Sequence, residues 1–312
     1  MSEAQLDHLV DEITRRVQAR LREARPSGPV GGGCSVESSD APTASACDSC
    51  RGCHLYRADD VRNIIQLGAS RVSAGIGHEA PAKDLAQIID HTLLKPDASR
   101  DDLKKLCDEA KRYGFATVCV NASNIRFCAA QLEGSSVKPI AVVGFPLGAA
   151  TPNSKAFEAR EAVRNGAQEI DTVINVGALK SKDYSLVLDD ISAVVAAAAP
   201  RPVKVILETG GLEHDEKVIG CSLSKIAGAA FVKTSTGFGP GGATAEDVAL
   251  MRAIVGDEMG VKASGGVRTV DDVRKMVAAG ATRIGASASV SIVSGKNETA
   301  KGPNRRARGG GY

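Results

Sequence analysis

The chain lacks tryptophan and is poor in other aromatic residues, which make up 3% of its 312 residues. Its core must therefore be built from Val, Ile, Leu and Ala, a composition that suits parallel strands covered by helices. No apolar run approaches the ~18 to 20 residues that a membrane-spanning helix needs. The 39 basic and 37 acidic residues nearly balance, so charge gives no general reason to expect nucleic acid or a membrane as a partner.

The first residues, MSEAQLDHLVDEITRR, lack the apolar segment of a secretory signal. We therefore expect a cytoplasmic protein. Residues 1–24 instead carry apolar positions at steps of three and four, which is typical of an amphipathic helix. These positions are Leu6, Leu9, Val10, Ile13, Val17 and Leu21.

Three further segments follow this predicted helix. Residues 25–80 are rich in Gly, Ser and Pro and predict a flexible linker that holds a group of cysteines. Residues 81–293 alternate strand and helix patterns and predict one folded domain. Residues 294–312 predict a flexible C-terminal tail.

Eight apolar strand candidates alternate with helical segments in the predicted domain. They are Ile88–Leu94, Thr117–Asn121, Ile140–Phe145, Ile170–Asn175, Val203–Glu208, Phe231–Ser235, Val261–Ser264 and Arg283–Ser287. Eight strands in about 210 residues, roughly 26 per strand–helix unit, predict a (β/α)8 TIM barrel of the α/β class. An open doubly wound sheet is the alternative, but no G-x-G-x-x-G motif follows the first strand. Glycines ahead of five strands predict helix C-caps, at Gly114, Gly166, Gly228, Gly260 and Gly280.

Lysines inside two apolar strands are the strongest functional signal. Lys233 lies in AAFVKTSTG and Lys262 in GVKASGG, at comparable positions of adjacent predicted strands. Lysine is almost never fully buried without a partner. Burial and a neighbouring cation both lower a lysine pKa and leave a neutral amine, which attacks a carbonyl group to form a Schiff base. The alternative is a charged lysine pair satisfied by carboxylates, for which the candidates are Asp171, Glu208 and Asp90.

Asp171 interrupts the apolar run of another predicted strand, EIDTVIN. A carboxylate in a strand interior is costly unless it is paired or hydrogen-bonded, and a lysine partner would remove that cost. A carboxylate beside an amine can also move protons during Schiff-base formation.

Glycine-rich turns end the last two predicted strands, at Gly265–Gly266 and Gly285–Ser287. In (β/α)8 barrels the turns at these positions often bind phosphate through backbone amides. We therefore expect a phosphorylated substrate, to which Arg268 could add a charged contact.

Eight segments follow one another along about residues 84–293. They are DHTLLKP, TVCVNASNI, VVGFPLGA, EIDTVINVGALKS, VKVILET, FVKTSTGFGPGGAT, VKASGGVRT and ATRIGASASVSIV. In this order they resemble the deoxyribose-phosphate aldolase family. The resemblance implies a metal-free class I aldolase that needs no cofactor and forms homo-oligomers. The implied reaction is the reversible cleavage of 2-deoxy-D-ribose 5-phosphate into D-glyceraldehyde 3-phosphate and acetaldehyde.

The resemblance also assigns roles to individual residues. It implies that Lys233 forms the Schiff base, that Lys262 tunes it, and that Asp171 relays protons. Further residues match the substrate pocket and its phosphate loops, namely Asp90, Cys119, Thr234, Gly266, Gly285 and Ser287. For Cys119 the alternative is a small buried hydrophobic side chain.

Two features of the C-terminal part bear on the resemblance. Tyr312, in the final GGGY, resembles a C-terminal tyrosine that carries a proton to the active site in the family. The alternative is a frayed terminus with no role. Ala288 departs from the family pattern, because a second small hydroxyl residue is expected after Ser287, and this departure predicts weaker phosphate binding.

The resemblance does not cover the N-terminal cysteines, which are Cys34, Cys47, Cys50 and Cys53. The last three form C-x2-C-x2-C ahead of His54, a spacing that suits Zn²⁺ or an iron–sulfur cluster. Cys34 is distant and the usual spacing of the fourth ligand is missing, so free or redox thiols are an equal alternative. A structural disulfide is not expected in the cytoplasm.

An amphipathic helix tethered ahead of an enzyme resembles the encapsulation peptides of bacterial microcompartment cargo. Residues 1–24 are therefore predicted to bind a shell protein. Self-association or packing on the barrel are the alternatives. Two other functions stay open from the sequence: a transaldolase-like Schiff-base aldolase, and a non-catalytic, shell-associated metal-binding scaffold.

Overall fold

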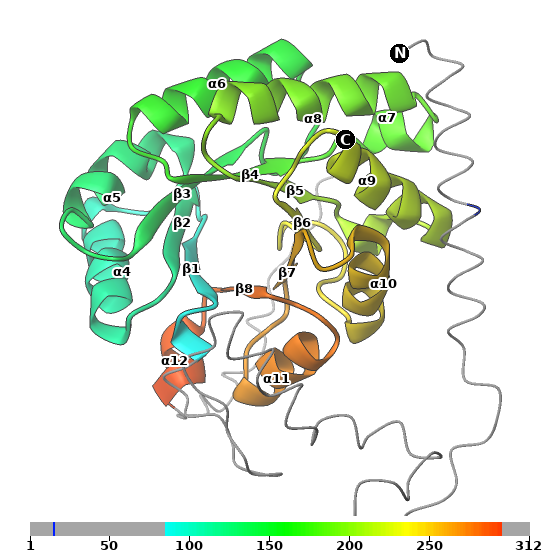
Figure 1. Cartoon of the computed structure of the whole chain (residues 1–312). Coiled ribbons are helices and arrows are strands. Elements are labelled where there is room, and N and C mark those ends of the chain that lie inside the picture. Colours follow the sequence, from blue (N-terminus) through cyan, green and yellow to red (C-terminus); the bar gives the residue numbers. More distant parts are fainter. Residues whose placement is uncertain (1–14, 16–84, 295–312) are drawn as a thin grey trace, which may run out of the picture. The chain divides into compact units, whose positions relative to one another are not determined.

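The computed structural model describes residues 85–294, together with Arg15. Eight parallel strands form one closed barrel in sequence order (Figure 1). They are β1 (Ile89–Leu93), β2 (Thr117–Asn121), β3 (Lys138–Val143), β4 (Glu169–Val173), β5 (Val203–Ile206), β6 (Phe231–Lys233), β7 (Gly260–Ser264) and β8 (Arg283–Ala286). Pairing of β1 with β8 closes the barrel. The predicted (β/α)8 fold is confirmed.

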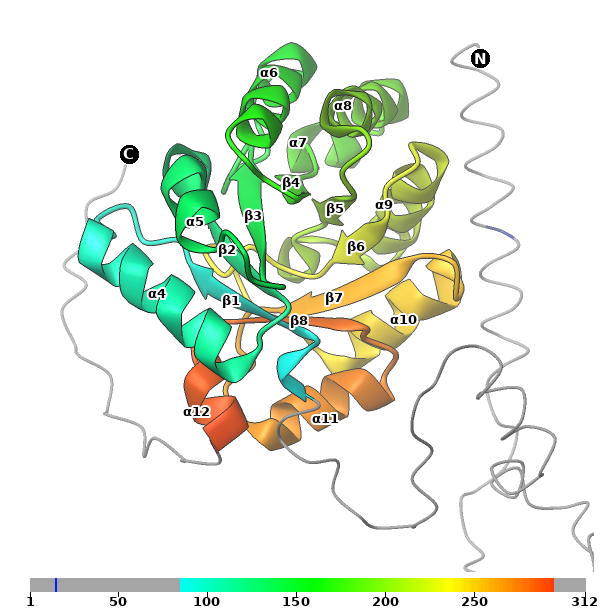
Figure 2. The same ribbon diagram turned by 60° about the vertical axis from the view of Figure 1, so that its left-hand side comes forward.

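Helices form a layer outside the strands (Figure 2). They are α4 (Arg100–Tyr113), α5 (Ile125–Gln131), α6 (Pro152–Arg164), α7 (Val176–Lys180), α8 (Tyr184–Ala198), α9 (His214–Ile226), α10 (Ala245–Val255), α11 (Val270–Ala278) and α12 (Ser289–Ser294). Two short 3-10 helices, η2 (Ala122–Asn124) and η3 (Thr209–Gly211), follow β2 and β5. No helix in residues 85–294 is long and apolar enough to cross a membrane.

Local sequence signals set the helix ends. The Ser99 hydroxyl accepts a hydrogen bond from the Asp102 amide at 3.2 Å, and the Asp102 carboxylate accepts one from the Ser99 amide at 2.9 Å, so α4 begins with a capping box. Gly114 ends the same helix in the left-handed conformation, with φ 70°. Thr151 caps α6, and Pro152 occupies its first turn, where a missing N–H costs nothing.

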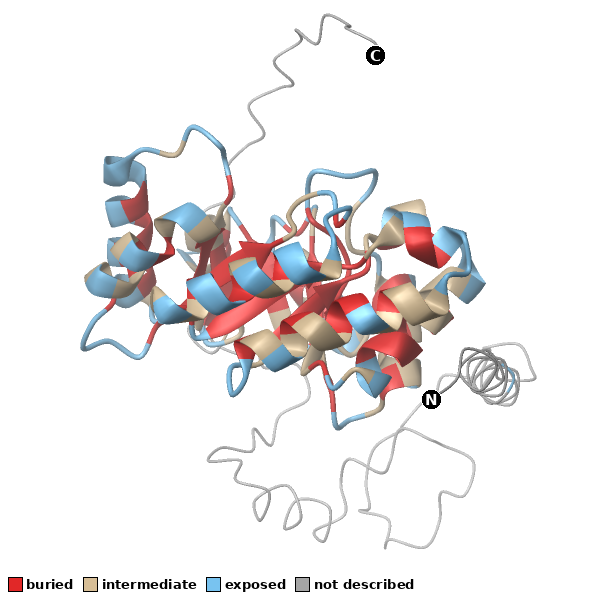
Figure 3. Cartoon of the chain, turned by 90° about the horizontal axis from the view of Figure 1, so that it is seen from above, coloured by how far each residue is buried: buried red, intermediate tan, exposed pale blue. Residues whose placement is uncertain are grey.

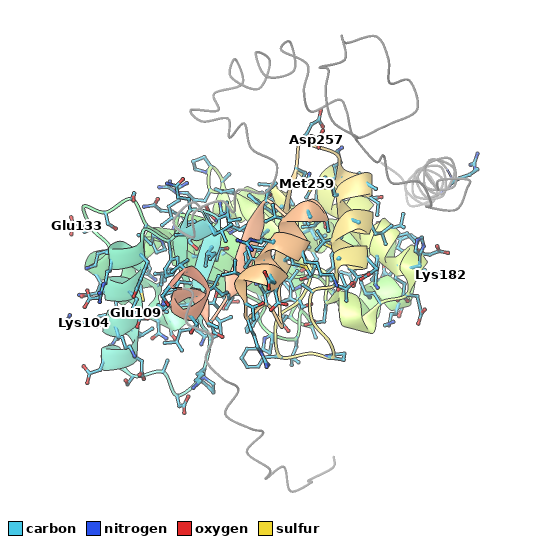
Figure 4. All side chains as sticks on the ribbon, turned by 90° about the horizontal axis from the view of Figure 1, so that it is seen from below. Lys104, Glu109, Glu133, Lys182, Asp257 and Met259 are labelled. Carbon is cyan, nitrogen blue, oxygen red and sulfur yellow. The ribbon has the colours of Figure 1, made fainter. Side chains whose placement is uncertain are left out.

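Side chains of the strands and side chains on the outer faces of the helices differ in burial. The strands are buried, whereas the helices expose their outer faces (Figure 3). Between strands and helices lies an apolar core that includes Val118, Val205, Val232 and Ile284, all without exposed surface. Charged side chains such as Lys104, Glu133 and Lys182 project from the periphery (Figure 4). Charged groups inside the barrel are therefore exceptional and require an explanation.

One of the glycines predicted to cap a helix has another role. Gly260 is the first residue of β7, and helix α10 ends instead at Gly256, with φ 71°. A β carbon on Gly260 would lie 2.1 Å from ring atoms of Phe231. The prediction of a cap at Gly260 was wrong, because the glycine is there to admit an aromatic ring on the neighbouring strand.

Candidate active site

The barrel interior holds a cluster of charged side chains. Because side chains alternate along a strand, residues two apart face the same side, and Glu169 and Asp171 of β4 both point inward. In the register of the sheet Asp171 lies opposite Lys204, and Lys233 lies opposite Lys262. The members are Asp90, Glu169, Asp171, Lys204, Lys233, Lys262 and Arg283. We call them the interior cluster.

Asp171 is the centre of the interior cluster. Its Oδ1 accepts a hydrogen bond from Lys204 Nζ at 2.9 Å. Its Oδ2 accepts one from Lys233 Nζ at 3.0 Å and another from Lys262 Nζ at 2.8 Å. Burial alone would raise the pKa of Asp171, but attraction by the three ammonium groups outweighs burial and holds that pKa well below its ordinary value. Asp171 is therefore an ionised carboxylate shared by three lysines, one each from β5, β6 and β7.

Asp90 provides the second carboxylate at this level of the barrel. Its Oδ2 lies 2.5 Å from Lys262 Nζ, and its Oδ1 accepts hydrogen bonds from Thr117 at 2.7 Å and Arg283 at 2.8 Å. Burial opposes ionisation, but Lys262, Lys204 and Arg283 together lower the pKa of Asp90 to about 2. Asp90 thus stays charged and holds Lys262 in place.

Glu169 and Arg283 lie one layer closer to the N-terminal ends of the strands. Arg283 contacts Glu169 at 3.1 Å, and Lys204 Nζ lies 2.6 Å from Glu169 Oε2. The pKa of Arg283 is raised, since the nearby Asp90 and Glu169 carboxylates outweigh the effect of burial. The sequence analysis did not identify Glu169, Lys204 and Arg283. These residues lie below Asp171 and Asp90 in the barrel and contact both carboxylates through Lys204 and Arg283.

The two lysines singled out from the sequence have opposite protonation tendencies. Burial, followed by repulsion from Lys262, lowers the pKa of Lys233, and its contact with Asp171 offsets this only in part. Burial also acts on Lys262, but two carboxylates, Asp171 and Asp90, reverse it and raise its pKa. The residue patterns alone did not distinguish the two, and the separate roles given to them came from the family resemblance. Contact with a second carboxylate favours the charged form of Lys262, whereas Lys233 is the lysine of the two that gives up its proton more easily.

A count of charges leads to the same assignment. The interior cluster contains three carboxylates, on Asp90, Glu169 and Asp171, and four cationic side chains. A dry interior strongly disfavours net charge. The cluster is neutral when one lysine is uncharged, and Lys233, which contacts a single carboxylate oxygen, has the weakest hold on its proton.

Two predicted pocket residues are buried beside the cluster. Cys119 lies in an apolar group with Leu94 and Ile140, and burial raises the pKa of its thiol to about 11, so the thiol stays protonated at neutral pH. The Thr234 hydroxyl donates a hydrogen bond to the Ser264 carbonyl at 2.8 Å and accepts one from the Ser264 amide at 3.0 Å. Thr234 therefore ties β6 to β7.

The predicted phosphate positions occupy three different environments. Gly266 is exposed in the turn after β7, with φ 80°. Gly285 is buried in β8, where a β carbon would lie 3.0 Å from Lys262 Cε, so this glycine makes room for the lysine stem. Ser287 is exposed between β8 and α12 and lines a surface hollow that also includes Thr92.

Several predictions fall outside the described residues. These concern Tyr312, residues 1–24 apart from Arg15, and the cysteines Cys34, Cys47, Cys50 and Cys53. The described cysteines, Cys107, Cys119, Cys128 and Cys221, are buried free thiols. Residues 85–294 contain no group of three His, Cys, Asp or Glu side chains that could hold a metal ion.

A closed eight-stranded barrel whose interior holds a buried lysine of lowered pKa is the arrangement of a lysine-dependent barrel aldolase. The chain belongs to the DeoC/LacD family of aldolases, whose family model matches residues 85–301. This membership confirms the resemblance found in the sequence. Residues 1–84 lie outside the match.

Several known proteins that are highly similar to this chain are named deoxyribose-phosphate aldolase. The chain is 57% identical to a deoxyribose-phosphate aldolase from Streptococcus gordonii over 218 residues, which are 70% of this chain and 98% of that protein. It is 59% identical to a deoxyribose-phosphate aldolase from Clostridium novyi over 219 residues, 70% of this chain and 99% of that protein. A tetrameric deoxyribose phosphate aldolase structure from Aeropyrum pernix is similar with a TM-score of 0.66 and 34% identity, and the match covers 76% of this chain and 98% of that one.

Proposed function

We propose that the protein is a deoxyribose-phosphate aldolase that cleaves 2-deoxy-D-ribose 5-phosphate reversibly into D-glyceraldehyde 3-phosphate and acetaldehyde. The observation that carries the proposal is the buried Lys233 amine, with its lowered pKa, in a chain that is 57% identical to a protein of that activity. Its partners are a phosphorylated sugar and small aldehydes.

The first half of the reaction forms a Schiff base. The neutral Lys233 amine attacks the aldehyde carbon of the open-chain sugar and gives a carbinolamine. Loss of the hydroxyl group as water, with a proton supplied by an acid, leaves a protonated imine. Lys262 is the cation placed to assist this step, because its ammonium group shares Asp171 Oδ2 with Lys233.

The second half breaks the carbon–carbon bond. The hydroxyl group on the third sugar carbon loses its proton, the bond between the second and third carbons breaks, and its electron pair moves toward the iminium nitrogen. D-glyceraldehyde 3-phosphate leaves, and the remaining enamine takes a proton on carbon. Water then hydrolyses the imine, which releases acetaldehyde and restores the Lys233 amine.

Asp171 connects the acid and the nucleophile in this scheme. A single oxygen, Oδ2, accepts hydrogen bonds from both Lys233 and Lys262, so a proton can pass between the two amines over about one hydrogen-bond length on each side. Because the pKa of Asp171 is strongly lowered, the carboxylate orients the amines and does not retain the proton.

The proposal is tested by trapping the imine. Borohydride reduction in the presence of acetaldehyde should attach an ethyl group to the peptide that contains Lys233, as read by mass spectrometry. Lys233→Ala should remove the adduct and the activity, whereas Lys104→Ala, which changes an exposed lysine on α4, should keep both. A wild-type protein without the Lys233 adduct would overturn the proposal. Trapping with dihydroxyacetone in place of acetaldehyde would favour a transaldolase-like enzyme.

Two assembly properties extend this proposal. We propose a homo-oligomer, supported by the tetrameric Aeropyrum pernix relative and tested by light scattering of the full chain. We also propose that residues 1–24 bind a microcompartment shell protein, supported by their amphipathic sequence pattern. Acetaldehyde is volatile and reactive, so a shell around its source would retain it.

A further inference from the structure

Glu208 has an unusual backbone conformation at the point where the chain leaves β5, the strand that carries Lys204 of the interior cluster. It follows β5 and has φ 58° and ψ 57°, the left-handed region that side chains other than Gly and Asn rarely adopt. In residues 85–294 just one other non-glycine residue, the exposed Lys182, has a positive φ. Such strain persists where surrounding contacts over-determine it, and it is often connected with function.

The Glu208 carboxylate binds the loop that follows the proposed Schiff-base strand. Its Oε2 accepts hydrogen bonds from the Thr236 amide, at 3.2 Å, and from the Thr236 hydroxyl. The Thr236 hydroxyl oxygen in turn accepts hydrogen bonds from the amides of Phe238, at 3.0 Å, and Gly239, at 3.3 Å. A β carbon on Gly239 would lie 2.7 Å from Glu208 Cδ, so this loop rests directly on the carboxyl group.

The same loop, residues 236–243, continues to the turn after β7. The Ala243 amide donates a hydrogen bond to the Gly265 carbonyl at 2.9 Å. A β carbon on Gly242 would lie 2.5 Å from that carbonyl oxygen, so the two backbones touch. Gly265 and Gly266 both have positive φ, at 88° and 80°. The loop therefore supports the glycine turn that the sequence predicts to bind phosphate.

The other side of the loop reaches across the barrel. Phe238 packs its ring edge-to-face against Phe145, which follows β3, with the ring centroids 5.3 Å apart. More than half of the Phe238 surface is exposed. The loop thus extends from the end of β3 to the turn after β7. Hydrogen bonds between Glu208 and Thr236 hold it to the end of β5.

We propose that Glu208 is a positioning residue for the phosphate end of the substrate, acting through the 236–243 loop on the Gly265–Gly266 turn. This inference rests on the proposed function and deepens it. Within the described part of the chain, Glu208 forms no ion pair with any lysine, and its polar contacts are with Thr236 and backbone. It therefore acts on phosphate binding and leaves the imine chemistry to the interior cluster.

Two substitutions distinguish the effect of the Glu208 carboxylate from the effect of its strained backbone conformation. Glu208→Gly removes the carboxylate and also relieves the positive φ, since glycine adopts it freely. Glu208→Gln keeps a side-chain oxygen that can accept both Thr236 bonds. We expect Glu208→Gly to raise KM for 2-deoxyribose 5-phosphate about tenfold with kcat changed less than about twofold, the pattern of lost binding. Glu208→Gln should stay within about threefold of wild type.

Substrates without phosphate provide the decisive comparison. Glu208→Gly should leave kcat/KM for 2-deoxyribose unchanged. The Kd of the same variant for inorganic phosphate, measured by calorimetry, should rise by the same factor as its KM for 2-deoxyribose 5-phosphate. Thr236→Val, which removes the hydroxyl group that links Glu208 to the loop, should give the same split and serves if Glu208→Gly does not fold. Equal losses on both substrates, or unchanged phosphate binding in the folded variants, would overturn the proposal.

The proposed function is tested separately in the same proteins. Acetaldehyde carries no phosphate, so borohydride trapping on Lys233 should be equal in wild type and Glu208→Gly. Absence of trapping in the wild type would refute the aldolase mechanism. Equal trapping together with unchanged phosphate affinity would refute the positioning role of Glu208 alone.

Discussion

Replacing Lys262 with methionine tests the electrostatic basis of the proposed catalysis. The substitution keeps a long, flexible side chain and removes one positive charge from the interior cluster. Three carboxylates would then face three cationic side chains, so the cluster would be neutral with Lys233 protonated. We expect Lys262→Met to return the proton to the Lys233 amine at neutral pH and to abolish most of the activity.

The size of the effect follows from the geometry. Lys233 Nζ and Lys262 Nζ contact the same Asp171 oxygen at 3.0 and 2.8 Å, so the two nitrogens lie at most about 5.8 Å apart. At an effective dielectric constant of about 20, two unit charges at that distance repel by about 3 kcal/mol. Losing that repulsion corresponds to about a 100-fold smaller fraction of neutral amine wherever the amine is mostly protonated.

The sign of the pH dependence is fixed by the same argument. The amine is reactive when unprotonated, so activity falls as pH drops through the pKa of Lys233. Lys262→Met raises that pKa, because a repelling cation is lost, and the acid limb of kcat/KM therefore moves to higher pH. Borohydride trapping with acetaldehyde, measured as a rate across pH, reports the amine directly.

A charge-preserving control completes the test. Lys262→Arg keeps the cation beside Asp171, so its acid limb should stay near that of the wild type even where kcat changes. Thermal melting should show that both variants are folded. If the acid limb of Lys262→Met does not move, or if both variants shift equally, repulsion by Lys262 is not what keeps the Lys233 amine neutral.

Three further outcomes are expected. Lys155→Met leaves the buried Asp190 carboxylate without its partner at 2.6 Å, so it should lower the free energy of unfolding by about 3–5 kcal/mol in urea titrations. Adding Asp190→Leu should recover most of the lost stability. A double variant whose loss is the sum of the two single losses would contradict this expectation. Gly260→Ala forces a methyl group against Phe231 and should lower the free energy of unfolding by about 1–3 kcal/mol. Adding Phe231→Leu should restore part of that stability. An unchanged stability of Gly260→Ala would contradict the clash. Deletion of residues 1–24 should leave kcat/KM unchanged and abolish pull-down of a shell protein, so lost turnover would place the segment in the catalytic fold.

The barrel itself could be predicted from the sequence because each strand–helix unit repeats the same apolar pattern. All eight strands occur where the pattern placed them, and their ends differ by at most two residues, as in Phe231–Ser235 against the observed Phe231–Lys233. The predicted strands run long at their C-terminal ends, as at Glu208 and Ser235. There the chain leaves the sheet to form the site, although its side chains remain buried or half-buried.

The lower layer of the interior cluster could be found in part. Lys204 lies in VKVILE and interrupts an apolar strand as Lys233 does, so the same signal was present. Glu169 lies two residues before Asp171 and therefore on the same face. Arg283 gave no comparable signal, because an arginine at the start of a strand is ordinary on a protein surface. Lys155 is buried inside an otherwise polar helical segment and could not be recognised without its partner Asp190.

The opposite pKa shifts of Lys233 and Lys262 depend on closure of the barrel, and no local sequence pattern predicts that closure. Both are lysines in apolar strands, directly opposite each other, and both contact Asp171. Lys262 also reaches Asp90, on β1, because β8 pairs with β1 and brings the first strand beside the last. In an open sheet Asp90 would lie at a distant edge, and the two lysines would compete equally for one carboxylate. Closure places Lys262 between two carboxylates and leaves Lys233 with Asp171 alone, and this difference supports Lys233 as the proposed nucleophile.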